Sequence, residues 1–397
     1  MCCPKSRKKA AAKIKTAKWY EALMLISRRS AVLLAGLLRS GNKSAGLALG
    51  WMLAGAGSIF LFDPAPVLAL TIETTYESSW ATAPSGATAD VNNVINQLES
   101  DFNHSNVTIN IQFGWGDING AAIPANDLGV TNFPQNFVSF PPTPLYSLSQ
   151  VNGFITAAAA ANPTNTALNI AANHLPSSYP GYTNPGFFIP DAQYLALTGK
   201  AQNSNTINAY IGFGTLSGSG FSWSTTGGQP GSTQFDLTSV LEHEITHALG
   251  RVDYAFSYPL TNPAFLTLLD LFKFNKATNT RDPRFSNTNF SIDGGMTYPT
   301  SGTAGVFSNQ SDSSDWQNIL ASGACPGSDS FDACLEPGIL TTMSSLDLTE
   351  MCALGWSGSA CGTVPAVPLP AALPLFATGL GALGLLGWRR KRKAIAA

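Results

Sequence analysis

Two of the chain's four histidines lie four residues apart with a glutamate between them, in His243-Glu244-Ile245-Thr246-His247. On an α-helix, side chains at positions i and i+4 lie one turn apart on the same face. The segment therefore predicts a helix that presents both imidazoles to one point, where they can bind one cation. Glu244 would then project beside an open coordination position, where a carboxylate can act as a general base.

The residues around this motif fit the same helix. Asp236 or Ser239 can cap its N-terminus, and Ser239 is followed three residues later by Glu242, which is the spacing of a capping box. Gly250 follows three residues after the second histidine, where a left-handed residue can end the helix. The apolar side chains expected to face the core are those of Leu241, Ile245 and Ala248.

A catalytic zinc site usually has three protein ligands, and no histidine follows His247. The other two histidines, His104 and His174, lie upstream of the motif. A downstream carboxylate is therefore the expected third ligand. Asp253 lies three residues after Gly250, and a turn at that glycine could bring its carboxylate back beneath the metal.

The segment from His243 to Asp253 resembles the HExxHxxGxxH/D signature of metzincins, in the snapalysin-like variant that ends in aspartate. Later blocks resemble a family of exported bacterial metzincin-like metalloproteases, and the likeness covers roughly residues 70–357. It implies a zincin-like α+β fold with a mixed sheet, an active-site helix and a loop-rich C-terminal subdomain. It also implies one catalytic Zn²⁺. The blocks are residues 268–274, 290–295, 314–316 and 345–356.

The same resemblance introduces a second candidate ligand. Several relatives, like leishmanolysin-type enzymes, have His-Trp where this chain has Asp315-Trp316, and they take their third ligand from there. Asp253 and Asp315 therefore both remain candidates. Metzincins also have a methionine loop beneath the zinc. By block order that position falls at Leu335, with Met343 as the nearest substitute.

Other parts of the body carry weaker signals. The strand expected at 208–213 resembles the zincin edge strand, which pairs with an extended substrate, although plain sheet is the alternative. Structural Ca²⁺ could bind the acidic residues of the C-terminal loops, and solvated loop acids are the alternative. These residues are Asp293, Asp312, Asp329 and Asp332.

Patterns elsewhere predict mixed α and β structure. Apolar residues every three or four positions predict helices, and alternation predicts strands. Residues 114–145 are rich in Gly, Pro and Asn and are predicted as a loop. The expected helices cover 88–102, 148–161 and 164–174, and the expected strands cover 70–76, 107–113 and 208–213.

Charged residues make up only 12% of the chain and are unevenly distributed. Of its 22 Lys and Arg residues, eleven lie in residues 1–69 and five in Arg389–Lys393, which leaves six elsewhere. All but two of the 24 acidic residues lie in the part between these ends. Such an acidic body argues against nucleic acid as a partner, because phosphates would be repelled.

Both ends are predicted to be sorting signals. Residues 45–62 are apolar and follow a basic region, and small residues at 67–69 suit a signal peptidase. At the other end, Val367-Pro368-Leu369-Pro370-Ala371 precedes an apolar run, long enough to span a bilayer, and a basic cluster. This tail resembles the VPLPA variant of the PEP-CTERM class. The resemblance implies transient anchoring in the inner membrane, removal by an exosortase and a cell-surface or extracellular location; an ordinary membrane anchor is the alternative.

The expected domains follow from these signals. Residues 1–69 form an export leader, residues 70–362 a metalloprotease catalytic domain and residues 363–397 a sorting tail. Within the catalytic domain we expect an N-terminal subdomain at 70–252 and a C-terminal subdomain at 253–362. Two cysteine pairs in the latter, each nine residues apart, predict local disulfides, with free thiols or another connectivity as alternatives. These pairs are Cys325 with Cys334 and Cys352 with Cys361.

Two classes of function remain after this reading. The first is a secreted or surface zinc endopeptidase that hydrolyses protein or peptide substrates, with Glu244 as general base. The second is a non-catalytic surface or extracellular-matrix protein that retains a metallopeptidase fold, which the missing third histidine would favour. A metal hydrolase that acts on a non-peptide bond is a further alternative. Metal content separates the first two, since an enzyme should hold about one equivalent.

Overall fold

The computed structural model describes residues 69–134, 143–202, 206–254, 265–284, 288–299, 305–309, 312–317, 325 and 327–362. All of them belong to Val67–Ala397, the second of the two units into which the chain divides. The predicted leader, apart from Ala69, and the predicted sorting tail lie outside these ranges. Within them, no helix combines the length and hydropathy needed to cross a membrane.

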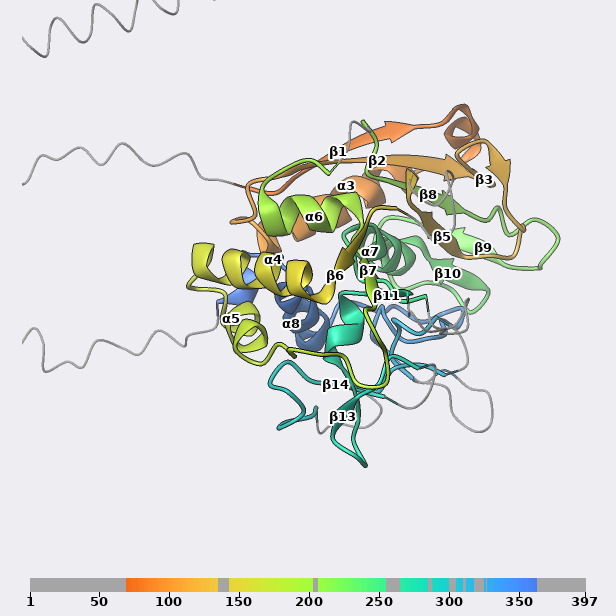
Figure 1. The fold of residues 1–397 in the computed structure, drawn as a ribbon. Coiled ribbons are helices and arrows are strands. Elements are labelled where there is room, and N and C mark those ends of the chain that lie inside the picture. The colour runs from red at the N-terminus through yellow and green to blue at the C-terminus, as the bar shows by residue number, and fades with distance from the viewer. Residues whose placement is uncertain are drawn as a thin grey trace, which may run out of the picture. The chain divides into compact units, whose positions relative to one another are not determined.

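The described residues form a mixed α and β fold that contains a four-stranded sheet (Figure 1). Three of its strands are parallel, and the fourth, at one edge, runs antiparallel to its neighbour. In spatial order the strands are β1 (Thr71–Tyr76), β2 (Thr108–Trp115), β8 (Ala209–Phe213) and β5 (Gly129–Asn132).

Two predictions about this sheet are wrong. The strand predicted at 208–213 is present as β8, but it lies between β2 and β5 and is not an edge strand. The segment 114–145, predicted as a loop, contains the edge strand β5. All four residues of β5 are half-buried, so no alternation of buried and exposed positions marks the strand in the sequence. The same segment holds β3 (Asp117–Ile118) and β4 (Ala121–Ala122).

Two helices pack against the sheet and against each other. Helix α3 (Ala87–Asp101) contacts β1, and α7 (Leu237–Ala248) contacts β8 and β5. The buried residues of α3 recur at helical spacing, which confirms the predicted helix and its core-facing side. Its larger buried apolar residues are Val91, Val94, Ile95 and Leu98.

The other helices form a second group, in which α4 contacts α5 and α6 and α5 contacts α8 (Figure 1). The break between the first two falls at Asn162 and Pro163, as predicted, because proline lacks the backbone N–H that a helix interior needs. The helices are α4 (Leu148–Ala161), α5 (Thr166–Asn173), α6 (Asp191–Thr198) and α8 (Ser345–Ala353).

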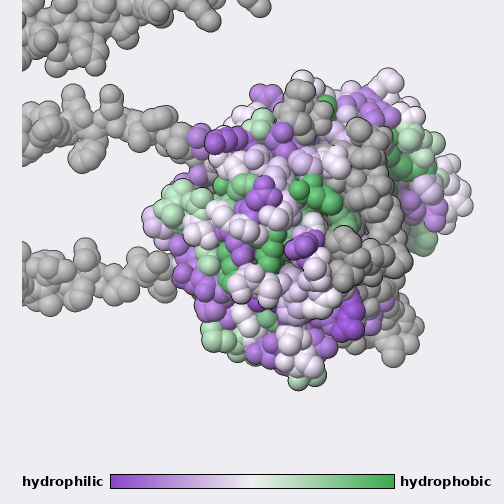
Figure 2. Space-filling model, in the orientation of Figure 1, coloured by the Kyte–Doolittle hydropathy of each residue, from purple (hydrophilic) through white to green (hydrophobic). Residues whose placement is uncertain are grey.

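Figure 2 shows one face of the molecule, on which hydrophilic residues surround small groups of hydrophobic ones. The remaining secondary-structure elements are short. Strands β6 (Leu145–Ser147), β7 (Gly186–Phe188) and β11 (Phe265–Thr267) form one small sheet. A second contains β12 (Lys273–Asn275), β13 (Thr280–Arg281) and β14 (Asn289–Phe290), and β9 (Ser222–Ser224) pairs with β10 (Gln234–Asp236). The 3-10 helices are η1 (Ser78–Thr82), η3 (Leu269–Phe272) and η4 (Ser359–Cys361).

Aromatic rings fill much of the core beside the four-stranded sheet. Ring centroids lie 5.8 to 6.5 Å apart in a connected set that includes tilted, edge-to-face and stacked pairs. Such pairs add to the stabilisation that comes from burying large apolar surfaces. The rings belong to Trp80, Phe113, Trp115, Phe213 and Trp223.

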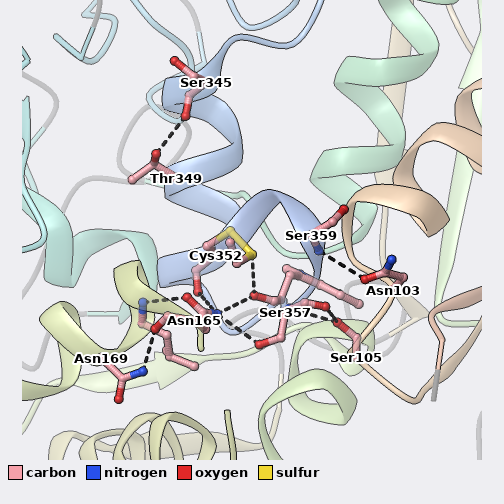
Figure 3. Close-up of a disulfide and its surroundings, with 12 residues drawn as sticks. Asn103, Ser105, Asn165, Asn169, Ser345, Thr349, Cys352, Ser357 and Ser359 are labelled. Carbon is pink, nitrogen blue, oxygen red and sulfur yellow. Dashed lines mark hydrogen bonds between the residues drawn. A yellow bond between two sulfur atoms is a disulfide. The ribbon is translucent and has the colours of Figure 1, made fainter. Parts of the chain in front are cut away.

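Both predicted disulfides are present, Cys325–Cys334 and Cys352–Cys361. The second joins α8 to η4. Beside it, the amide of Asn165 donates hydrogen bonds to the carbonyl oxygen of Cys352 at 3.2 Å and to that of Trp356 at 2.8 Å (Figure 3). These contacts fasten the C-terminal end of α8 to the start of α5.

Candidate metal centre

Helix α7 carries the HExxH motif and is held at both ends. The carboxylate of Asp236 accepts a hydrogen bond from the backbone N–H of Ser239 at 2.7 Å, so Asp236, and not Ser239, is the N-cap. Gly250 follows the helix with a φ of 112°. A Cβ at this glycine would lie 2.7 Å from the Cβ of Gln193, so both the backbone angle and the space require glycine.

The imidazoles of His243 and His247 meet with their Nε2 atoms 2.8 Å apart. Nδ1 of His243 lies 2.8 Å from the carbonyl oxygen of Ser330, and Nδ1 of His247 lies 2.5 Å from that of Arg251. Because a carbonyl oxygen only accepts, we assign the hydrogen of each ring to Nδ1. Both Nε2 atoms then carry lone pairs that face one another, which is the arrangement for binding a shared cation.

Asp315 brings a carboxylate oxygen to the same point. Its Oδ1 atom lies 3.7 Å from Nε2 of His243 and 3.9 Å from Nε2 of His247. This oxygen is buried and accepts no hydrogen bond from the described residues. A buried acceptor without a donor is costly unless a positive charge compensates it. The three separations bracket the ~3.3 Å expected between ligands of a tetrahedral Zn²⁺ with bonds of ~2.0 Å.

Asp253, the other candidate, has a different partner. Its carboxylate forms a buried ion pair with Nζ of Lys273, which also donates to the carbonyl oxygen of Ser313 at 3.3 Å. Among the described residues, the one group of metal-ligating side chains that converge consists of His243, His247 and Asp315. The structure therefore brings Asp315, and not Asp253, to the two histidines.

Burial determines the protonation of these three groups. Burial, together with the neighbouring His247, lowers the pKa of His243 to about 3, and burial lowers the pKa of His247 to about 4. Both rings are therefore neutral near pH 7, which is the form that binds metal ions. Burial, and then the charge of Asp312, raises the pKa of Asp315 well above its usual range. A metal ion that binds at neutral pH would displace a proton from this carboxyl.

Glu244 lies against the edge strand β5. The hydroxyl of Thr131 donates to Oε2 of Glu244, with an oxygen separation of 2.6 Å. A Cβ at Gly129 would lie 2.5 Å from Oε1 of Glu244, so only glycine permits this approach. Burial raises the pKa of Glu244 to about 8, against the lowering effect of the Thr131 hydrogen bond. Neither Gly129 nor Thr131 was predicted as a site residue from the sequence, because residues 114–145 are predicted there as a loop.

An aromatic ring lies against the two imidazoles. The ring of Phe331 stacks on His243 with centroids 4.7 Å apart and meets His247 edge-on at 5.7 Å. The metzincin resemblance predicted a methionine loop at this place, with Leu335 or Met343 as its residue. Leu335 instead lines the neighbouring cleft, and Sδ of Met343 lies 3.8 Å from the hydroxyl of Thr246. An apolar residue inside an acidic loop gives no periodic signal that would single out Phe331.

A cleft of about 510 Å³ opens at the metal centre and is lined by His243, Glu244 and Asp315. This volume is in the range that holds a small ligand or a short segment of peptide. Its lining residues come from the segment that leads into β5, from α7 and from the C-terminal loops. The lining residues include Asn126 to Gly129, Ser239, Val240, Asp329, Ser330, Asp332, Leu335 and Thr341.

The acids considered as Ca²⁺ ligands hold their own loops. Oδ1 of Asp293 accepts hydrogen bonds from the Ser291 hydroxyl at 2.7 Å and from the backbone N–H of Thr297 at 2.9 Å. Oδ1 of Asp312 accepts the N–H of Ser314 at 2.8 Å and its hydroxyl at 2.6 Å. The latter bonds close the turn that places Asp315.

Comparisons with protein-family models, with curated proteins and with solved structures gave no match. The metal centre and its cleft are therefore the features of this chain that indicate a function. Two features carry the most information, the facing imidazole nitrogens and the unpartnered oxygen of Asp315.

Proposed function

We propose that this protein is an exported, zinc-dependent endopeptidase with a zincin-like fold. The observation that carries the proposal is the convergence of two neutral imidazoles and an unpartnered, buried carboxylate oxygen beside a cleft. Two imidazoles with one carboxylate suit Zn²⁺ better than Mg²⁺ or Ca²⁺, which prefer oxygen ligands. His243, His247 and Asp315 would hold the ion.

Glu244 is the proposed general base and acid. A Zn²⁺ ion held by these residues would supply Lewis acidity for a scissile carbonyl and for the attacking water. Glu244 would take a proton from that water and then deliver it to the leaving amine. Thr131 holds the carboxylate in position by its 2.6 Å hydrogen bond, and Gly129 leaves the space for it. Strand β5 thus supports the proposed base.

The proposed substrate is an extended segment of polypeptide. Strand β5 is the terminal strand of the described sheet, and Gly129 lines the cleft. A peptide added alongside β5 would gain backbone hydrogen bonds in the manner of an extra strand. Its scissile carbonyl would then lie next to Glu244, because this side chain contacts β5.

We also propose that the chain acts outside the cytoplasm. The two disulfides support this location, because such bonds persist in oxidising compartments. The leader at 1–69 would direct export, and the VPLPA-type tail at 363–397 would serve as a transient membrane anchor. Signal peptidase and an exosortase would process the two ends.

The matched pair Glu244→Gln and Glu242→Gln tests this function. Both glutamates are buried on α7, but Glu242 accepts the backbone N–H of Met343 at 2.9 Å. We expect the wild-type chain to hold about one Zn²⁺ and to cleave an unfolded casein substrate, with loss of cleavage in a chelator. Glu244→Gln should keep the metal and slow cleavage by roughly 100-fold or more.

Glu242→Gln should cleave at close to the wild-type rate. Undiminished cleavage by Glu244→Gln would refute the assigned base. A purified wild-type chain that holds no zinc and cleaves nothing would instead support the non-catalytic surface protein.

A further inference from the structure

We infer that Arg251 is a positioning residue for all three candidate ligands of the metal centre, one through its backbone and two through its buried guanidinium. The inference rests on the proposed metal centre. Arg251 is 0% exposed, and its atoms contact a support of each ligand in turn. A second group of residues, on α8, holds Arg251 itself.

The link to His247 is through the backbone. The carbonyl oxygen of Arg251 accepts the Nδ1 hydrogen of His247 at 2.5 Å, which turns Nε2 towards His243. The backbone N–H of Arg251 donates to the carbonyl oxygen of Thr246 at 3.3 Å, directly after the turn at Gly250. The place of residue 251 therefore determines the orientation of this ring.

The link to Asp315 uses the residues on either side of it. Nε of Arg251 lies 3.3 Å from the carbonyl oxygen of Ser314 and donates to it. The guanidinium carbon lies 4.6 Å from the ring centroid of Trp316. The indole N–H of Trp316 and Nη1 of Arg251 both donate to Oδ1 of Asp347, at 2.8 and 2.6 Å. Arg251 thus holds in place the residue immediately before Asp315 and the residue immediately after it.

The link to His243 passes through an aromatic ring. The guanidinium carbon of Arg251 lies 3.5 Å from the ring centroid of Phe331, a cation–π contact away from solvent. The same ring stacks on His243, and the preceding residue, Ser330, accepts the Nδ1 hydrogen of that histidine at 2.8 Å. Movement of the guanidinium would therefore release both supports of His243.

Helix α8 holds the guanidinium. Arg251 pairs with Asp347 at 2.6 Å and with Glu350 at 3.2 Å, and all three side chains are 0% exposed. The helix is in turn anchored by the Cys352–Cys361 disulfide and by Asn165 (Figure 3). A planar guanidinium can bind two carboxylates and stack on two rings at once, which a lysine ammonium cannot.

Arg251→Lys tests this role against a matched control, Arg281→Lys. The guanidinium of Arg281 also lies over a ring, 4.8 Å from the centroid of Phe274, and donates to the carbonyl oxygens of Leu271 and His174. Three quantities are measured: the Zn²⁺ dissociation constant by chelator competition, the visible spectrum of the Co²⁺-loaded protein, and the melting temperature of the metal-free protein.

We expect Arg251→Lys to weaken Zn²⁺ binding by about 10- to 100-fold and to alter the Co²⁺ spectrum. Arg281→Lys should lower only the melting temperature. Phe331→Leu keeps an apolar side chain without the flat ring, and it should weaken Zn²⁺ binding by about tenfold with a shifted Co²⁺ spectrum. If Arg251→Lys fails to fold, Phe331→Leu provides the test of the positioning role.

Wild-type affinity and spectrum in either folded variant would overturn the positioning role and leave the proposed function intact. A wild-type chain that binds neither metal would overturn the proposed function itself.

Discussion

The two parts of the described body, up to residue 252 and from 253 onwards, are stabilised differently. The first contains the four-stranded sheet, helices α3 to α7 and the aromatic core. The second contains one α-helix, short strands and both disulfides. Within the described ranges, every ion pair of a Lys or Arg with a carboxylate has at least one partner in the second part.

This difference bears directly on the metal centre. Regular helices and strands satisfy their own backbone groups, so apolar burial suffices to position helix α7, which carries His243 and His247. Loops need side chains for the same purpose, and the turn before Asp315 is closed by the carboxylate of Asp312. The backbone of two ligands therefore depends on a regular helix, whereas the backbone of the third depends on a loop held by buried polar and charged groups. Substitutions in the two parts should consequently have different effects.

The largest contrast is expected between Asp315→Asn and Asp253→Asn. Loss of a ligand should weaken Zn²⁺ binding by at least about 100-fold in the first variant. The second should leave Zn²⁺ binding unchanged and cost about 3–5 kcal/mol of unfolding free energy, because Lys273 loses its buried partner. Zinc titration and urea denaturation of each variant measure both effects.

The pH dependence of stability sharpens the same contrast. The pKa of Asp315 in the folded, metal-free protein is raised above its unfolded value. Its favourable contribution is therefore present at low pH and is lost as the pH rises through the folded pKa. Metal-free Asp315→Asn should gain stability relative to wild type as the pH rises.

Loss of zinc binding in Asp253→Asn, with retention in Asp315→Asn, would reverse the ligand assignment.

The next largest effect concerns α8. Replacement of both Cys352 and Cys361 by alanine opens a loop closed over nine residues, which should cost about 2–3 kcal/mol. Zinc affinity should also fall, since α8 carries the partners of Arg251. As the matched change in the first part, Ile109→Ala in β2 should cost about 2–5 kcal/mol. Calorimetry with and without zinc should show an undiminished zinc-induced shift for Ile109→Ala only; equal shifts would contradict the contrast.

The smallest effect is expected from Thr131→Val in β5. The lost hydrogen bond normally lowers the pKa of Glu244, so its removal should raise that pKa above about 8 in the metal-free protein. A general base must be deprotonated, and the acid limb of the kcat/KM profile should therefore move to higher pH. At pH 7 the rate should fall by roughly threefold to tenfold. An unshifted profile would show that Thr131 does not support the base.

The sequence predicted local features of both parts better than contacts between distant segments, for a physical reason. Helix α3 and strand β2 follow from apolar spacing, and a cap at Asp236 or Ser239 and the turn at Gly250 follow from local backbone chemistry. Two nine-residue cysteine spacings likewise predicted both disulfides. Each of these signals is contained within a short stretch of chain.

The missed features depend on contacts between distant segments. Strand β5 lacks alternation, and its role follows only from its contact with Glu244, more than a hundred residues later. The choice of Asp315 over Asp253 depends on Lys273, a buried cation that takes the second carboxylate. The contact of Phe331 with His243 joins a loop to a helix. No local pattern carries this information.

Anomalous diffraction at the zinc edge, from crystals of the body grown with Zn²⁺, tests the central claim most directly. We expect one strong peak bounded by Nε2 of His243, Nε2 of His247 and a carboxylate oxygen of Asp315, with Asp253 still paired to Lys273. A zinc ion bound by Asp253, or no peak between the two imidazoles, would contradict it.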